Sequence, residues 1–187
     1  MGYFDHEKNV QEYINMVEGY NGAELINALK NYLPKGSSLL ELGMGPGKDL
    51  DILTRSYVVT GSDSSQIFVD QYKQGHEDAD VIVLDAVKVE AGKKFDCIYS
   101  NKVLHHLKKR DLDKSIHRQK DVLNDGGILF HSFWHGHKVE EHHGMLFVYY
   151  LEEQLIEKVQ DDFEILEIKK YSEMETNDSF YIVLKTR

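Results

Sequence analysis

The sequence predicts an α/β fold: a doubly wound, mostly parallel seven-stranded sheet with helices on both faces and an antiparallel strand pair at its C-terminal end. Between residues 38 and 133, short apolar runs alternate with helical patterns, as parallel strands buried beneath helices require. The apolar runs at 163–171 and 179–185 are joined by a short link, which favours antiparallel pairing. The length of 187 residues suits one core, so we expect a single domain over 1–187.

Residues 1–33 carry two helical patterns, separated at Gly19–Gly22. Tyr13, Met16 and Tyr20 lie on a roughly common face of this region. We expect residues 1–33 to form a helical lid or cover that belongs to the single domain. Ordinary helix packing explains the shared face equally well.

The remaining elements follow in regular order. Strands are expected at 38–42, 57–61, 80–84, 94–100 and 128–133, before the final pair. Helices are expected between them and before the final pair, at 49–55, 65–74, 111–123 and 151–159. The His-rich segment 134–144 is predicted to be a loop.

The composition restricts partners and compartment. A formal net charge of -10 and a pI near 5.4 argue against a nucleic-acid substrate, because proteins that grip phosphate backbones cluster Lys and Arg. Cys97 is the single cysteine, which leaves no internal disulfide. The sequence shows no basic and apolar leader and no run of membrane-spanning length. We expect a cytoplasmic monomer or homodimer without a membrane or nucleic-acid partner.

The segment 39–50, LLELGMGPGKDL, places three glycines between a strand and a helix. Such a turn lets backbone N–H groups approach a ligand near the positive end of the helix dipole. A nucleotide-triphosphate loop fails, because Leu42 and Asp49 occupy positions that need Gly and Ser or Thr. A dinucleotide loop is disfavoured, because Lys48 occupies its third glycine position. An NAD(P)-dependent oxidoreductase is therefore the less favoured alternative.

The same segment resembles motif I of the class I, Rossmann-like S-adenosylmethionine-dependent methyltransferases, in which an acid and a G-x-G-x-G turn follow the first strand. These positions are Glu41, Gly43, Gly45 and Gly47. The resemblance implies S-adenosylmethionine as cofactor, with Glu41 near its amino-acid end and the glycine turn, including Met44, around its methionine part. Tyr20 of the lid is expected to contact the cofactor as well.

Acids at the ends of the next two strands agree with this resemblance. Asp63 follows the loop by about twenty residues, where a carboxylate accepts hydrogen bonds from ribose hydroxyls. The resemblance places Asp85, after the third strand, opposite the adenine amino group. Ser64, Ala86 and Asn101 are expected beside these acids, in contact with the cofactor.

The segment 95–107, FDCIYSNKVLHHL, resembles the motif IV region of the same family. Enzymes that methylate adenine, cytosine N4 or glutamine amides carry an Asn/Asp-Pro-Pro-aromatic turn here, and its absence disfavours those acceptors. His105 or His106 is the candidate catalytic base, because a neutral imidazole accepts a proton near pH 7. The alternative is a structural histidine beside the cofactor, as is common in the family.

The acceptor is expected near the end of the fifth strand. Trp134, His135 and Tyr149 or Tyr150 are candidates for contacts with it, because loops at this end of a sheet usually carry specificity. Core packing is the competing explanation for the tyrosines. The histidines of segment 134–144 raise the alternative of a Zn or Ni site, but they lack a fixed tetrahedral spacing, so no metal is expected.

We therefore expect an S-adenosylmethionine-dependent methyltransferase that moves a methyl group to a nucleophilic atom of a small molecule. The absence of an appended recognition domain favours a small acceptor over a polymer. A non-catalytic protein that binds the same cofactor, as a sensor or as a partner subunit, is the alternative that the sequence does not separate from the enzyme. The sequence leaves the acceptor unidentified.

Overall fold

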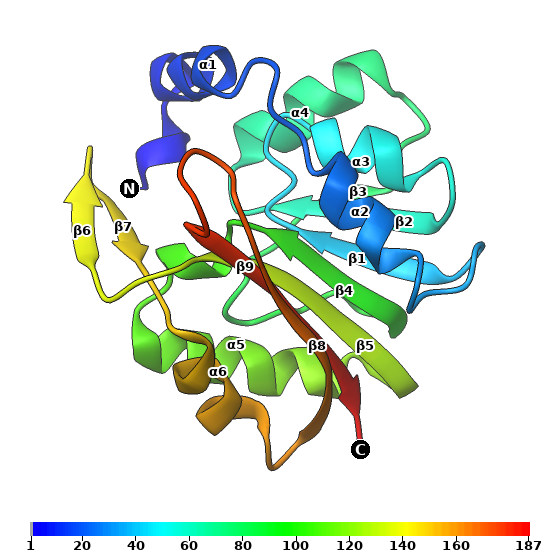
Figure 1. Ribbon diagram of the computed structural model, residues 1–187. Helices are drawn as coiled ribbons and strands as arrows, with labels where there is room; N and C mark the ends of the chain where they lie inside the picture. The colour runs from blue at the N-terminus through cyan, green and yellow to red at the C-terminus, as the bar shows by residue number, and fades with distance from the viewer. Residues whose placement is uncertain (1) are drawn as a thin grey trace.

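The computed structural model describes residues 2–187 and contains a seven-stranded sheet in the order β3-β2-β1-β4-β5-β9-β8 (Figure 1). Strands β1 to β5 pair in parallel, and β9 runs antiparallel to β5 and β8. The strand bounds are Ser38–Leu42 (β1), Val58–Asp63 (β2), Val81–Val83 (β3), Phe95–Asn101 (β4), Leu123–Trp134 (β5), Phe163–Tyr171 (β8) and Ser179–Thr186 (β9). The predicted fold class is confirmed.

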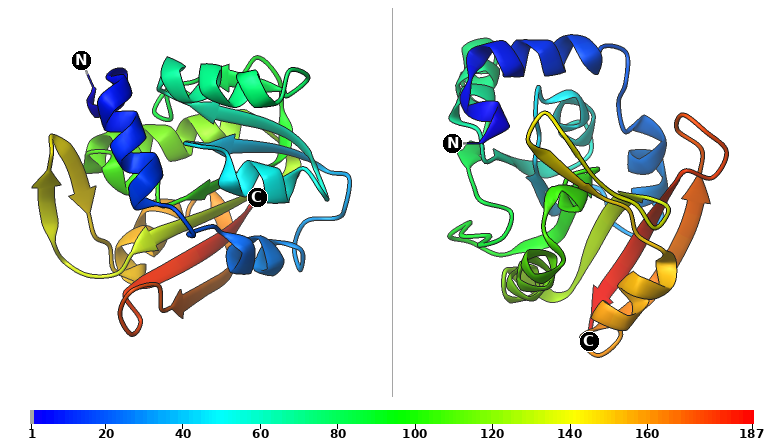
Figure 2. Two further views of the ribbon diagram at one scale, coloured as in Figure 1. Left: turned by 90° about the horizontal axis from the view of Figure 1, so that it is seen from above. Right: turned by 90° about the vertical axis from the view of Figure 1, so that its left-hand side faces the viewer.

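Helices cover both faces of the sheet (Figures 1 and 2). Their bounds are Glu7–Met16 (α1), Ala23–Leu29 (α2), Lys48–Leu53 (α3), Gln66–Gly75 (α4), Lys109–Asp121 (α5) and Glu152–Val159 (α6), with 3₁₀ turns at Tyr3–Asp5 (η1) and Leu104–His106 (η2). Buried side chains of α5 and α6 form one hydrophobic cluster with the sheet. Those of α2, α3 and α4 form a second cluster with it. The core therefore has two layers, one on each face of the sheet.

The middle of β4 shows how the sequence builds these layers. Ile98 packs with α5 and α6, whereas Cys97 and Tyr99 pack in the other cluster. Successive side chains of a strand point to opposite faces, so a strand covered on both faces is an unbroken apolar run. This is the pattern that predicted a parallel sheet.

The prediction of a loop at 134–144 is wrong in part, because this segment begins a β-hairpin. β6 (Val139–His142) pairs antiparallel with β7 (Met145–Val148). The two residues between them, His143 and Gly144, have φ of 53° and 78°, as a type I′ turn requires. The sequence signal was weak, because His-Gly is outside the usual Asn-Gly and Asp-Gly pairs.

The carboxyl ends of parallel strands lie at one edge of a sheet, where ligands of α/β proteins usually bind. In this protein α1, the β6–β7 hairpin and the link between β8 and β9 also lie at that edge (Figures 1 and 2). Segments far apart in the chain thus surround the ends of β1, β2 and β4. Within residues 2–187, no helix is both long and apolar enough to cross a membrane.

Candidate functional site

The turn between β1 and α3 holds its three glycines in left-handed backbone. Gly43, Gly45 and Gly47 have φ of 67°, 50° and 83°, which residues with a Cβ rarely adopt. A Cβ on Gly47 would also stand 2.2 Å from the ring of Tyr72. The Gly45 N–H donates to Oδ2 of Asp63 across 2.9 Å. The glycines therefore set the shape of the turn, and Asp63 ties it to the end of β2.

Two cavities meet at this turn. The smaller, of about 140 Å³, is called here the acidic cavity, because Glu41, Asp49 and Glu173 are among its lining residues. The larger, of about 410 Å³, is called the wide cavity and extends toward the ends of β2 and β3. The residues that line both are Tyr13, Gly43, Gly45, Asn101 and Lys102. The two cavities therefore adjoin along the glycine turn.

Most of the site residues predicted from the sequence lie at these cavities. Those that line the acidic cavity are Tyr20, Glu41, Gly43, Met44, Gly45 and Asn101. Those that line the wide cavity are Gly43, Gly45, Asp63, Ser64, Asp85, Ala86, Asn101 and His106. Those that line neither are Gly47, His105, Trp134, His135, Tyr149 and Tyr150.

Glu41 is the buried acid of the acidic cavity. It is 3% exposed, and its Oε2 has no hydrogen-bond partner within residues 2–187. Burial, reinforced by the nearby Asp49 and Asp63, raises the pKa of Glu41 well above its usual value. An unpartnered carboxyl oxygen in a cavity wall is suited to a charged donor such as an ammonium group.

The acid at the end of β2, Asp63, and the acid after β3, Asp85, are held differently. Asp63 is buried and accepts backbone N–H groups from Gly45 and Ser65, each across 2.9 Å. Burial raises the pKa of Asp63, and these N–H groups oppose the rise. Asp85 is exposed, and its Oδ1 accepts the Val87 N–H across 2.7 Å. Each carboxylate keeps further acceptor positions at the wall of the wide cavity.

Asp49 lies at the site but was not predicted from the sequence. It lies in the first turn of α3 and is buried. One carboxylate oxygen accepts the Gly22 N–H, and the other accepts the Tyr99 hydroxyl across 2.9 Å and the Asn101 amide across 3.0 Å. The Asp49 carboxylate thus joins three segments around the acidic cavity. Acids are common in the first turn of a helix because they interact favourably with the positive end of the helix dipole. The position of Asp49 in the sequence therefore did not indicate this role.

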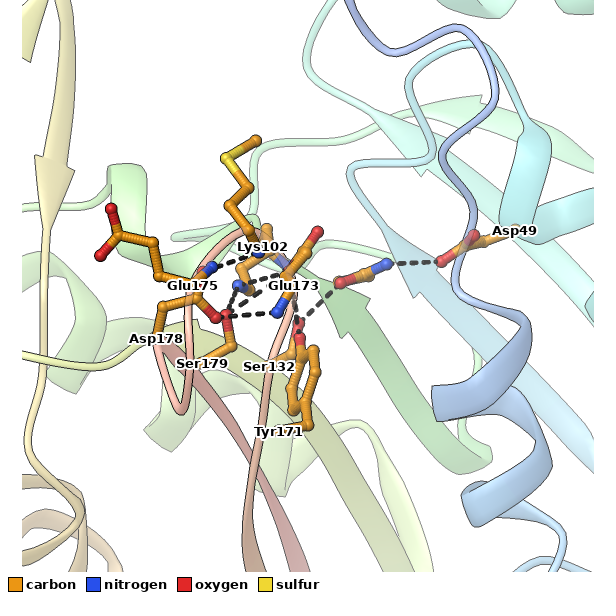
Figure 3. A network of polar contacts seen from close by, with 10 residues as sticks. Asp49, Lys102, Ser132, Tyr171, Glu173, Glu175, Asp178 and Ser179 are labelled. Atoms are coloured by element: carbon orange, nitrogen blue, oxygen red, sulfur yellow. Dashed lines mark hydrogen bonds and ion pairs between the residues drawn. The ribbon is translucent and has the colours of Figure 1, made fainter.

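Lys102 and Glu173 were also not predicted. Lys102 directly follows β4, has φ of 55°, and its side chain is 11% exposed. Its Nζ lies 2.8 Å from Oε2 of Glu173 and 2.6 Å from Oγ of Ser179 (Figure 3). Burial lowers the pKa of Lys102, and the Glu173 carboxylate opposes that shift. This ion pair connects the end of β4 to the link between β8 and β9.

The adjacent histidines after β4 have different surroundings. His105 is 1% exposed and neither of its ring nitrogens has a partner within residues 2–187; burial lowers its pKa well below the usual value. His106 lines the wide cavity, and its Nδ1 lies 2.7 Å from the Leu146 carbonyl oxygen. Because a carbonyl only accepts, Nδ1 carries the proton and Nε2 the free lone pair. Burial lowers the pKa of His106 too, so its ring is neutral near pH 7.

The four residues predicted to contact the acceptor lie outside both cavities. Tyr150 is 0% exposed and packs edge-on against the ring of Phe133, so the prediction of a pocket contact is corrected to a core residue. Nε2 of His135 lies 3.2 Å from a carboxylate oxygen of Glu152.

Trp134 and Tyr149 lie side by side, with ring centroids 6.3 Å apart. The Lys102 Nζ lies 3.3 Å from the Trp134 ring centroid, so Trp134 contacts the site through Lys102 and does not itself line a cavity.

The histidines of segment 134–144 do not form a metal site. The exposed His142, on the β6–β7 hairpin, has its Nε2 3.5 Å from a carboxylate oxygen of Glu140. Within residues 2–187, no three His, Cys, Asp or Glu side chains are grouped as a metal site requires.

Solved structures share the fold of this chain. The 1,6-didemethyltoxoflavin-N1-methyltransferase of Burkholderia thailandensis, with bound 1,6-didemethyltoxoflavin and S-adenosylhomocysteine, aligns with a TM-score of 0.81 and 14% identity over 96% of this chain and 84% of that one. A TehB-like S-adenosylmethionine-dependent methyltransferase from Corynebacterium glutamicum ATCC 13032 aligns with a TM-score of 0.74 and 20% identity over 97% of each chain. At these identities the likeness establishes the fold.

Sequence comparisons address the family. An uncharacterized 37.1 kDa protein in transposon TN4556 of Streptomyces fradiae is 35% identical in an alignment of 107 positions, which covers 50% of this chain and only 29% of that protein. A family model described as a methyltransferase domain matches residues 11–163, which is most of the chain. The chain therefore belongs to the methyltransferase domain family, which confirms the resemblance seen in its glycine turn and its acids.

Proposed function

We propose that this protein is an S-adenosylmethionine-dependent methyltransferase with a small-molecule acceptor. The observation that carries the proposal is the order of acids along the two adjoining cavities: Glu41 lines the acidic cavity, and Asp63 and Asp85 line the wide one. The cofactor has a matching order of groups, with an amino acid at one end and an adenosine at the other. The small molecule bound in the Burkholderia thailandensis structure supports an acceptor of similar class here.

The residues present fit both ends of this cofactor. The unpartnered Oε2 of Glu41 suits an ammonium group in the acidic cavity. At the wide cavity, Asp63 and Asp85 offer carboxylate oxygens to ribose hydroxyls and to the adenine amino group. At Gly45 an added Cβ would meet only the Tyr13 ring, at 3.7 Å, so this position leaves room for the cofactor between the two ends, whereas Val103 fills the space beside Gly43.

When bound, S-adenosylmethionine would supply an activated methyl group to a lone pair of the acceptor and would leave as S-adenosylhomocysteine, whose sulfur keeps the electron pair of the broken C–S bond. The task of the protein is to hold donor and acceptor in line. Tyr13, Asn101 and Lys102 line both cavities, where the two halves of a bound cofactor would meet. We assign His106 as the base for the proton of the acceptor, because its ring is neutral and its Nε2 lone pair is free.

Calorimetric titration with S-adenosylmethionine, S-adenosylhomocysteine and NAD tests the cofactor assignment. We expect both adenosyl compounds to bind and NAD to bind more weakly or not at all. Tighter binding of NAD would contradict the proposal and favour an oxidoreductase. A screen of candidate acceptors for release of S-adenosylhomocysteine then tests turnover. Cofactor binding without turnover on any acceptor would favour the non-catalytic alternative.

A further inference from the structure

Lys102 lies where the two cavities join. It directly follows β4 and lines both cavities, whereas Lys48 lines only the acidic cavity and Lys108 only the wide one. Among residues 2–187, Lys102 is the one lysine in both linings. A cofactor that spanned both cavities would therefore present its reacting group near this positive charge.

The Lys102 ammonium has three neutral groups near it, in addition to its carboxylate partner Glu173. Its Nζ lies 3.3 Å from the ring centroid of Trp134 and 5.4 Å from that of Tyr171. The Ser179 hydroxyl lies 2.6 Å from it (Figure 3). Aromatic faces attract a cation through their quadrupole and leave its charge intact. Glu173 is the carboxylate that pairs directly with Lys102, across 2.8 Å, and Asp178 adds a smaller attraction that also favours the charged ammonium.

Glu173 stands on a loop whose shape is fixed by another residue. The Asp178 carboxylate accepts the backbone N–H groups of Glu173, Met174 and Glu175, each across 2.9 Å (Figure 3). This loop therefore keeps its turn when the Glu173 side chain leaves Lys102. The Glu173 side chain is itself 27% exposed, so water can solvate its carboxylate once the ion pair with Lys102 is broken.

We propose that Lys102 binds a carboxylate of the methyl acceptor, which replaces the Glu173 carboxylate as its partner. This inference rests on the proposed function, because it places the reacting methyl group at the join of the cavities. The acceptor class is then a small carboxylic acid with a nucleophilic atom near its carboxylate. A protonated amine is disfavoured, because it would face the Lys102 ammonium and has no lone pair for the attack.

The carboxylate of the cofactor itself is the competing partner for Lys102. The experiment distinguishes these two possible partners of Lys102 by keeping the cofactor site filled while the acceptor site is probed. S-adenosylhomocysteine fills the cofactor site and carries that carboxylate. Butyrate, butyramide and butylamine then serve as probes of one chain length that differ in charge.

Trp134 supplies the readout, because it is the single tryptophan of the chain and lies beneath the Lys102 ammonium. Binding of S-adenosylhomocysteine is measured first by calorimetry, and the saturated protein is then titrated with each probe. We expect butyrate to change the Trp134 emission in a saturable way, with a Kd roughly tenfold below that of butyramide. We expect butylamine to leave the emission unchanged.

Variants assign the response to the proposed residues. Lys102→Met is expected to lose the butyrate response, and Lys102→Arg to keep it, because the arginine restores the charge. Glu173→Gln is expected to bind butyrate roughly threefold more tightly, because the internal competitor is gone. Lys93→Met is the matched control: Lys93 also pairs with a carboxylate, that of Asp80 across 2.9 Å, but lines neither cavity. It should respond as the wild type does.

Equal responses to butyrate and butyramide, including no response to either, would overturn the proposal. A butyrate response that survives in Lys102→Met would overturn it as well. If Lys102→Met weakens S-adenosylhomocysteine binding by more than roughly tenfold and butyrate displaces that compound, Lys102 binds the cofactor carboxylate and the proposal fails. Failure of the wild type to bind S-adenosylhomocysteine in the first step would count against the proposed function instead.

Discussion

The hydroxyl of Tyr99 on β4 donates a hydrogen bond across 2.9 Å to Oδ2 of Asp49 on α3. Asn101 donates to the same oxygen, and the Gly22 N–H donates to the other. The Asp49 carboxylate therefore gathers donors from β4 and from the segment between α1 and α2. Loss of a buried acceptor leaves its donors without a partner, and an unpaired buried donor lowers stability by more than a formed hydrogen bond adds to it.

Asp49→Ala is therefore expected to lower the free energy of unfolding by about 3 kcal/mol, because three donors lose their partner. Tyr99→Phe removes only one of those donors and is expected to cost about 1 kcal/mol. Urea unfolding followed by circular dichroism measures both. An Asp49→Ala variant as stable as the wild type would show that water satisfies these donors.

Replacement of Asp63 tests the adenosyl end of the site. Asp63→Ala is expected to weaken S-adenosylhomocysteine binding by at least roughly tenfold, because it removes the proposed ribose acceptor and frees the Gly45 N–H. Asp80→Asn is the control, since Asp80 binds Thr60 and Lys93 and lines neither cavity. It should lower stability without changing the Kd. Calorimetry that finds equal Kd values for Asp63→Ala and the wild type would show that the ribose contact is misassigned.

The sequence was most informative where local pattern decides structure. The bounds of β1 and β8 agree with the predicted 38–42 and 163–171, because each is an apolar run between breaks in the pattern. The ends of such strands lie at a known edge of the sheet, so Glu41 and Asp63 could be placed there from the sequence. The strand ends and the glycine turn thus predict the residues of the proposed cofactor half of the candidate site.

The other half depends on contacts between distant parts of the chain. Lys102 and Glu173 are 71 positions apart, and Asp49 and Asn101 are 52 apart. No local pattern encodes such pairs, and both were missed. Tyr150 shows a second reason why sites are hard to predict from sequence. An aromatic residue near a site has the same sequence signal whether it faces the core or a pocket.

The buried Glu41 carboxyl predicts how stability depends on pH. Its pKa in the folded state is raised above the usual 4.5, chiefly by burial. The stabilising contribution of the protonated form is therefore complete below pH 4.5 and is lost as the pH rises through the higher folded pKa. Glu41→Gln has no carboxyl group to ionise, so it avoids this loss of stability at higher pH, and its side chain keeps a similar shape. It should match the wild type in unfolding free energy below pH 4.5 and exceed it at neutral pH.

The same variant should bind S-adenosylhomocysteine more weakly at neutral pH, because an amide oxygen pairs less strongly with an ammonium group than a carboxylate does. Urea unfolding across the pH range and calorimetry at neutral pH measure the two effects of Glu41→Gln. Parallel stability curves for variant and wild type would contradict the raised pKa. Unchanged affinity would instead remove Glu41 from the cofactor site.

His106 and His105 form a matched pair for testing the catalytic base. His106→Gln is expected to lower kcat roughly a hundredfold on an acceptor found by the screen, with little change in S-adenosylhomocysteine affinity. His105→Leu should keep kcat, because neither ring nitrogen of His105 has a hydrogen bond to lose. Because burial lowers the pKa of His106 below 6.5, the wild-type kcat/KM should fall only below that pH, and this acid limb should vanish in His106→Gln. Rates of S-adenosylhomocysteine release across pH provide the measurement. If His105→Leu loses the limb while His106→Gln keeps it, the assignment of the base passes to His105.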